Sequence, residues 1–360
     1  MNRFENDVYI EGISTVLGQS KDLKEAVKAN EYFEEEYVAN ALTHVSVVEG
    51  LYPPELAVEA VNDVITNVSR TEFIRLHFHA STYFQGQDLW TPAAYIQNES
   101  LSISVPWIEV DQKSNGGLAA IHLARQLLSS KQQVGDVLIT TAERYAPPGF
   151  NRYRSESGTV MADGATAMIL STEKSPLRLV DSKLTADSSL EPMYRGEGFR
   201  SASQGGENAL DLRQRKMQFM LNHRRDLDSI SARIAGGLVD VMESLLSANS
   251  LNFSDVSRIV LPNNGKSVYW WRLLEQKGVS LSRTTWDFGK SIGHLGAGDQ
   301  AAALSDLLSR RSVSAGDYLL IAGSGYGFSW GAALLQVEPS YDGSAGATSR
   351  YSVAQVGGQQ

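Results

Sequence analysis

Two segments far apart in the chain, residues 111–139 and 291–320, share one pattern: a turn of small and polar residues, an apolar helix, and a strand that follows Gly-Asp. We refer to each turn as an elbow. The Gly-Asp pairs begin at positions 135 and 316, and this offset places Ser114 against Leu295, one residue after His294. A serine hydroxyl becomes a useful nucleophile when a neighbouring base accepts its proton. If the two repeats pack about a pseudo-twofold axis, the elbows meet near the centre and bring this hydroxyl and this imidazole together.

Both residues also have an ordinary structural role open to them. Ser114 could cap the helix that follows it, which is the commonest use of a serine in front of an apolar helix. His294 could be a core histidine whose ring nitrogens bind backbone groups. The repeat therefore predicts where a site would lie, and it says less about which reaction that site would perform.

The composition excludes several classes of protein. The chain has 360 residues, of which 42% are hydrophobic and 20% charged, and no apolar run is long enough to span a bilayer. A net charge of -9 argues against binding a nucleic-acid backbone. The absence of Cys excludes a disulfide, a thiolate metal site and a cysteine nucleophile. The first residues lack a secretory signal, so we expect a cytoplasmic protein without membrane or nucleic-acid partners.

Strand-like and helix-like segments alternate along the chain, which predicts a layered α/β fold. We expect an N-terminal half over residues 1–175, a C-terminal half over 176–338 and a flexible tail over 339–360, where Gly, Ser, Ala and Gln dominate. A turn is expected at Asp163-Gly164 and a polar loop over 195–208. The expected strands are 8–13, 73–78, 103–110, 137–141, 177–186 and 258–261, and the expected helices are 21–37, 54–68, 118–128, 212–248 and 267–276.

Three motifs carry a family resemblance. They are Ser-Asn-Gly-Gly at 114–117, Ala-Asp-Gly-Ala-Thr-Ala at 162–167 and Gly-Ser-Gly-Tyr-Gly-Phe-Ser-Trp-Gly at 323–331. In this order they resemble the nucleophile elbow, the internal Gly-Asp-Gly-Ala signature and the C-terminal glycine loop of thiolase-fold enzymes of the ketoacyl-ACP synthase III type. The resemblance extends over residues 8–337. Segments 87–93 and 147–154 are similar to a branch of that family associated with bacterial natural-product assembly lines.

The resemblance implies a thiolase fold, in which two pseudo-repeated βαβαβαββ halves form a five-layer αβαβα sandwich. It also implies a homodimer that takes an acyl group from coenzyme A or an acyl carrier protein as substrate. We expect no other cofactor and no metal. The glycines at 323–327 are followed by a strand-like segment rather than a phosphate-binding helix, so they do not indicate a nucleotide site.

The sequence departs from the family's Cys-His-Asn triad at all three positions. Ser114 stands at the cysteine position, Asn263 at the histidine position and His294 at the asparagine position. The resemblance implies that Ser114 is the nucleophile and His294 its base. An amide cannot act as a base, so we expect Asn263 to bind the oxyanion or to orient the imidazole, although it could simply shape a turn after Pro262. The elbow and oxyanion positions are Asn115, Gly116, Gly117 and Gly325.

Other side chains are candidates for substrate contacts. Arg144, Arg152 and Arg154 could meet the phosphate of coenzyme A or of a carrier protein, although they could equally be solvated loop residues. Phe150 and Trp270 could form part of an acyl or pantetheine tunnel. His77 and His79 share one face of a strand, but no third ligand stands at a useful spacing, so we expect core or cavity lining rather than a metal site.

These features predict an acyltransferase that forms an acyl-Ser114 intermediate in secondary-metabolite (polyketide-type) or fatty-acid-like biosynthesis. An oxygen ester is less electrophilic than a thioester, which disfavours condensation with malonyl groups. Two alternatives remain. One is a non-catalytic thiolase-fold partner subunit, and the other is a thioester hydrolase that uses the same serine.

Overall fold

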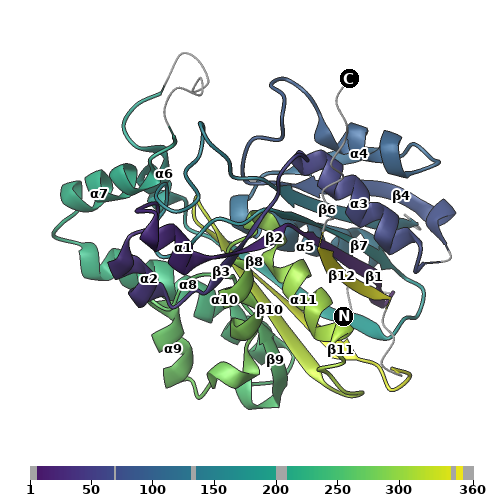
Figure 1. Ribbon diagram of the computed structural model, residues 1–360. Helices are drawn as coiled ribbons and strands as arrows, with labels where there is room; N and C mark the ends of the chain where they lie inside the picture. Colours follow the sequence, from purple (N-terminus) through teal and green to yellow (C-terminus); the bar gives the residue numbers. More distant parts are fainter. Residues whose placement is uncertain (1–5, 69, 131–134, 200–208, 342–345, 352–360) are drawn as a thin grey trace, which may run out of the picture.

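The computed structural model (Figure 1) describes residues 6–68, 70–130, 135–199, 209–341 and 346–351. Its main element is a mixed sheet with the strand order β5-β4-β6-β7-β1-β8-β11-β10-β9, and β12 pairs with β1 outside this path. Two halves of the sheet join where β1 pairs antiparallel with β8 over Val8, Tyr9 and Ile10. The strands are β1 (Val8–Leu17), β4 (Ile74–Ala80), β5 (Trp107–Val110), β6 (Asp136–Glu143), β7 (Gly164–Ser171), β8 (Leu177–Ala186), β9 (Val256–Val260), β10 (Tyr318–Gly325), β11 (Ser329–Val337) and β12 (Ala347–Tyr351).

The two halves of the sheet have the same strand arrangement, as the sequence repeat predicts. In the first half, β4 and β6 are parallel, and β7 and β1 follow antiparallel. In the second half, β9 and β10 are parallel, and β11 and β8 follow antiparallel. In the first half, β5 pairs parallel with β4. In the second half, a single parallel bridge between Ile259 of β9 and Thr284 takes the equivalent place. The expectation of two pseudo-repeated halves is confirmed.

Helices cover both outer faces and fill the space between the halves, so the architecture has five layers. On one outer face, α3 (Pro53–Ile65) packs on β1, β6 and β7, and α4 (Pro92–Ser100) packs on β4 and β5. On the other outer face, α8 (Leu227–Ala248) packs on β8, β10 and β11. The central helices α5 (Gly116–Leu128) and α11 (Asp299–Ser309) each contact strands of both halves.

The central helices begin at the two elbows, and their small residues allow the elbow backbones to touch. A Cβ atom on Gly117 would lie 2.3 Å from the carbonyl oxygen of Ala297. Packed protein interiors leave no room for such an overlap, so a side chain at this position would push the elbows apart. The glycines of the first elbow therefore serve the contact between the repeats.

The remaining elements are short and lie mostly around one end of the central helices (Figure 1). A separate two-stranded sheet pairs β2 with β3. These elements are β2 (Gln19–Asp22), β3 (His44–Val47), α1 (Leu23–Lys28), α2 (Glu34–Asn40), α6 (Pro192–Arg195), α7 (Leu212–Asn222), α9 (Trp270–Gln276), α10 (Trp286–Ile292) and the 3₁₀ turns η1 (Thr71–Phe73), η2 (Lys113–Asn115), η3 (Ser188–Leu190), η4 (Phe253–Asp255), η5 (Leu281–Arg283) and η6 (Gly296–Gly298).

Three expectations about elements were wrong. The helix expected over 21–37 is divided into β2, α1 and α2. The helix expected over 212–248 is interrupted after α7, where the backbone N–H and the ring Nδ1 of His223 both contact the Phe219 carbonyl oxygen. The expected tail contains β12, which lies parallel to β1 and is fastened by Arg350 to Glu59 and Asp63. Residues 200–208 of the expected polar loop lie outside the described residues.

Candidate active site

The structure brings Ser114 and His294 into direct contact. Ser114 lies in η2, immediately before α5, and its Oγ is 2.8 Å from Nε2 of His294, which lies just before η6. Nδ1 of His294 is 2.5 Å from Oδ2 of Asp299, the first residue of α11. The assignment that satisfies these contacts has the Ser114 hydroxyl donating to Nε2 and the Nδ1–H group donating to the carboxylate. All three side chains are buried.

Asp299 completes a chain of serine, imidazole and carboxylate that the sequence analysis did not foresee. Its Oδ1 accepts a hydrogen bond from the backbone N–H of Leu295 at 2.7 Å, and its Oδ2 accepts one from the backbone N–H of Asn263 at 2.8 Å. A fully buried carboxylate at the start of a central helix needs such partners. The sequence offered only the position of Asp299 five residues after His294, because the burial that creates this requirement is seen only in the structure.

The surroundings of His294 determine its protonation. Burial lowers the pKa of the imidazole, but the charge and the hydrogen bond of Asp299 outweigh burial and raise that pKa above its ordinary value. Glu143 contributes to the same effect from the adjacent strand β6. Burial raises the pKa of Glu143 itself to about 7, although Thr82 and the backbone N–H of Ala297 hydrogen-bond to it.

Asn263 contacts the groups that hold His294 in place. Its Nδ2 donates to the carbonyl oxygen of Gly293 at 2.9 Å, and its backbone N–H binds Asp299. The next residue, Asn264, lines the cavity that contains Ser114, whereas Asn263 does not. These contacts hold the His294 loop and the carboxylate that binds the imidazole, and the oxyanion and orienting roles of Asn263 both stay predictions.

The other elbow residues shape the first repeat around Ser114. The Asn115 side chain is buried and donates to Oε1 of Gln112 at 2.9 Å. A Cβ atom on Gly325 would lie 2.0 Å from the Gln112 carbonyl oxygen and 3.0 Å from the Asn115 backbone nitrogen. The lack of a side chain at Gly325 therefore lets the C-terminal glycine loop approach the elbow. Gly325 also lines the cavity. Gly116 and Gly117 open α5.

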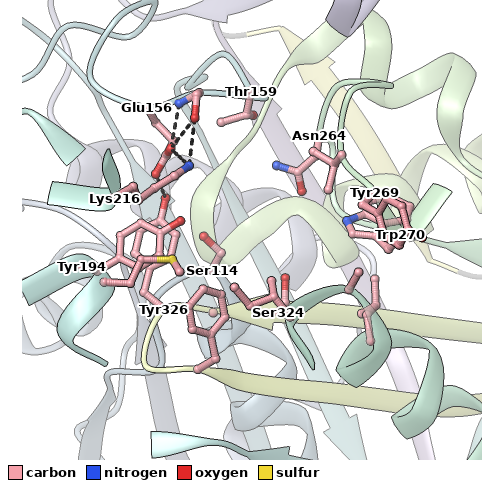
Figure 2. Close-up of a pocket in the computed structure, with 18 of the residues that line it drawn as sticks. Ser114, Glu156, Thr159, Tyr194, Lys216, Asn264, Tyr269, Trp270, Ser324 and Tyr326 are labelled. Carbon is pink, nitrogen blue, oxygen red and sulfur yellow. Dashed lines mark hydrogen bonds and ion pairs between the residues drawn. The ribbon is translucent and has the colours of Figure 1, made fainter. Parts of the chain in front are cut away.

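Ser114 and His294 face a cavity of about 410 Å³. Figure 2 shows Ser114 in the middle of it, between Glu156 and Lys216 on one side and Asn264, Tyr269 and Trp270 on the other. Trp270 lines the cavity, and its contact with an acyl or pantetheine group stays a prediction. This volume is within the range of pockets that hold small molecules.

The three arginines and Phe150 do not line this cavity. Arg152 forms a salt bridge with the buried Asp163, whose Oδ2 is 2.9 Å from the guanidinium. Arg154 binds the backbone carbonyl oxygens of Asn30 and Glu31, and Arg144 stands over the Tyr52 ring. Phe150 packs in a buried cluster with Tyr83, Tyr145 and Met161. Phe150 therefore packs outside the Ser114 cavity, and Arg152 is paired with Asp163. The tunnel role of Phe150 and the phosphate contacts of the arginines stay predictions.

His77 and His79 are core residues. Nε2 of His77 and Nδ1 of His79 lie 2.7 Å and 2.9 Å from the hydroxyl of Thr140. Burial lowers the pKa of His77 to about 3 and that of His79 to about 4, which keeps both rings neutral. Among the described residues, no group of three or more His, Cys, Asp or Glu side chains could hold a metal ion. In the same part of the chain, no helix combines the length and apolarity needed to cross a membrane.

Two segments of the chain match known protein families. Residues 108–188 match the family described as 3-oxoacyl-(acyl-carrier-protein) synthase III, and residues 246–337 match its C-terminal counterpart. These two segments contain Ser114 and the His294–Asp299 pair. The chain belongs to the ketoacyl-ACP synthase III-like family of the thiolase fold. The fold and family that the sequence motifs resembled are thus confirmed.

Three solved structures illustrate the relationship. An acyltransferase, ChlB3, is 28% identical, has a TM-score of 0.84 and aligns over 92% of this chain and 98% of its own. The 3-oxoacyl-(acyl-carrier-protein) synthase III of Aquifex aeolicus VF5 is 18% identical, with a TM-score of 0.73 over 91% of this chain and 99% of its own. The curacin-pathway HMG synthase, solved with a holo donor acyl carrier protein, is 14% identical, with a TM-score of 0.70 over 92% of this chain and 81% of its own. No curated protein matches the sequence.

Proposed function

We propose that this protein is an acyltransferase that takes an acyl group from a thioester onto Ser114 and passes it to an acceptor. The observation that carries the proposal is the chain of contacts from Ser114 Oγ to His294 Nε2 and from His294 Nδ1 to Asp299. A hydroxyl next to an imidazole that a carboxylate holds in place is the arrangement that activates serine nucleophiles on unrelated folds.

The contacts define the proton path of both half-reactions. Ser114 Oγ bonds to the thioester carbonyl carbon while its proton moves to Nε2 of His294. The carbon–sulfur bond then breaks, the sulfur takes that proton, and a free thiol leaves an oxygen ester on Ser114. In the second half-reaction an acceptor gives its proton to Nε2 and attacks the acyl carbon, and Ser114 Oγ regains a proton. His294 thus serves as base and then as acid in each half-reaction.

We propose coenzyme A or an acyl carrier protein as the donor, in secondary-metabolite (polyketide-type) or fatty-acid-like biosynthesis. The similarity to ChlB3 supports acyl transfer, and the carrier protein bound to the curacin HMG synthase supports a carrier as donor. Because the intermediate is an oxygen ester, an acceptor hydroxyl or amine fits it better than a malonyl carbon. Nothing in this scheme needs a metal or a further cofactor.

The test is the intact mass of the protein after incubation with short acyl-CoAs and acyl-loaded carrier proteins. We expect an added acyl mass on the native chain and none on Ser114→Ala, because the variant lacks the attacking oxygen. A slow loss of the adduct in buffer alone would identify water as an acceptor and support a thioester hydrolase. No adduct and no thioester turnover with any donor would contradict the proposal in favour of a non-catalytic partner subunit.

We further propose that the protein is a homodimer joined along β5. This strand ends the order of the main sheet, and its Trp107 and Ile108 side chains are 44% and 49% exposed. An apolar edge strand pairs with other chains unless something covers it. We expect sedimentation to give the mass of a dimer for the native chain and of a monomer for Ile108→Lys. The control Met217→Lys changes another exposed apolar side chain and should remain dimeric. A native monomer would refute the proposal.

A further inference from the structure

The cavity at Ser114 contains a second group of polar side chains that the proposed acyl transfer does not use. Lys216 forms an ion pair with Glu156, whose Oε1 is 2.5 Å from Nζ, and Nζ also donates to Ser157 Oγ at 2.9 Å. The Tyr326 hydroxyl donates to Oε2 of Glu156 at 3.1 Å. The Glu156 side chain is only 4% exposed. Taking the Glu156 carboxylate out of water costs free energy that an apolar side chain at this wall would not cost, which points to a role in binding.

This polar group has hydrogen-bonding capacity left over. An ammonium carries three N–H donors, and within the described residues Lys216 uses two of them, toward Glu156 and Ser157. Thr159 also lines the cavity, is 3% exposed, and its Oγ1 has no hydrogen-bond partner among the described residues. A buried hydroxyl without a partner destabilises the folded protein unless something else satisfies it. Lys216 and Thr159 both line the cavity that contains Ser114.

Exposure of the lining residues separates the mouth of the cavity from its floor. Ser231, Ser267 and Tyr269 are exposed and form the mouth. Ser114, Glu156 and Thr159 are buried and form the floor. A thioester arm that enters at the mouth therefore delivers its carbonyl carbon to Ser114 and leaves the acyl group to occupy the floor. Figure 2 shows the Glu156–Lys216 pair across the cavity from Tyr269 and Trp270.

We infer that Thr159 and Lys216 select an acyl group that bears a hydroxyl or oxo oxygen a few atoms beyond its thioester carbonyl. The inference rests on the proposed function, because it assumes that Ser114 accepts the acyl group. The free N–H of Lys216 donates to the oxygen of the acyl group, and the Thr159 hydroxyl can donate to it or accept from it. A site built to hydrogen-bond a substrate oxygen rejects an analogue without that oxygen far more strongly than an apolar pocket rejects a missing methylene.

The experiment measures the rate of acyl-Ser114 formation by intact mass, without any acceptor, using N-acetylcysteamine thioesters. The donors are butyryl and its 2-hydroxy, 3-hydroxy and 3-oxo derivatives, which share one carbon skeleton. We expect at least one oxygenated donor to react about tenfold faster than butyryl, and Thr159→Val to reduce that ratio about tenfold or to abolish the preference. A merely structural role for Thr159 would slow all four donors equally and leave the ratio unchanged.

Thr15→Val is the matched control, because Thr15 Oγ1 is also buried and unpaired but belongs to β1, away from the cavity. It should leave the ratio at the native value. Equal rates for all four donors on the native chain would overturn the inference while leaving acyl transfer intact, whereas no adduct from any thioester would refute the proposed function itself. A Thr159→Val defect seen with coenzyme A donors and not with N-acetylcysteamine donors would also overturn it, because the cavity floor would then bind the pantetheine arm.

Discussion

Replacement of Asp299 by Asn should slow the acylation of Ser114 by about 10⁴-fold, as removal of the carboxylate charge does in other serine–histidine–aspartate sites. The carboxylate accepts the Nδ1–H of His294 at 2.5 Å and thereby keeps Nε2 free to take the serine proton. An amide at this position can present its N–H₂ group to Nδ1, which favours the tautomer with the proton on Nε2. The measurement is the rate of acyl-enzyme formation in single-turnover mass spectrometry.

The pH dependence of the remaining activity gives a second readout. Acylation requires a neutral imidazole, so the rate rises with pH as His294 loses its proton. In the native protein Asp299 overcomes burial and raises the pKa of His294, so the rise should be centred above the ordinary histidine value. In Asp299→Asn the effect of burial remains and that of the charge is lost, so the rise should move to lower pH. An unchanged midpoint would show that Asp299 does not act on the base.

Asp306→Asn is the control for this variant. Asp306 lies on the same helix, α11, and pairs with Arg310 at 2.8 Å, so the substitution removes an equal charge from the same element. The control should acylate at close to the native rate. If both variants lost activity equally, the effect would belong to the helix and not to the contact with His294.

The position of the site could be predicted from the sequence because the repeat is visible in it. Small residues in both elbows mark where two backbones touch, and this contact places Ser114 against His294 although 180 residues separate them. The layered α/β fold could be predicted from the alternation of strand-like and helix-like segments along the chain. The interruption after α7 was not visible, because the helical pattern continues on both sides of the polar residues around His223.

The partners of the individual side chains could not be predicted in the same way. Asp299 looked like an ordinary first residue of a helix, and only the burial of that helix against both halves of the sheet shows that it needs a cation or a donor. Asn263 stands at the family's histidine position, but its side-chain hydrogen bond depends on the direction of the Gly293 carbonyl group. Such contacts between loops depend on backbone direction, which residue types and spacing do not specify.

Arg152 gives the second large expected effect, on stability. Arg152→Met should lower the free energy of unfolding by about 3–5 kcal/mol, the usual cost of removing one partner from a buried ion pair. The Arg152 side chain is 10% exposed and that of Asp163 is fully buried, and two N–H groups of the guanidinium reach the two carboxylate oxygens. After the substitution, the Asp163 carboxylate keeps, among the described residues, the backbone N–H groups of Val48 and Tyr145. Urea unfolding measures the loss.

The same variant decides between the structural role and the phosphate contact that the sequence suggested. Arg154→Met is the control, because Arg154 lies on the same loop but its guanidinium donates to Asn30 and Glu31. Its loss should cost about 1 kcal/mol, as for a few hydrogen bonds at the surface. If Arg152 bound a phosphate, Arg152→Met would instead leave stability near the native value and raise the KM for coenzyme A donors relative to N-acetylcysteamine donors. Because the guanidinium already binds both oxygens of a buried carboxylate, we expect the loss to appear in unfolding.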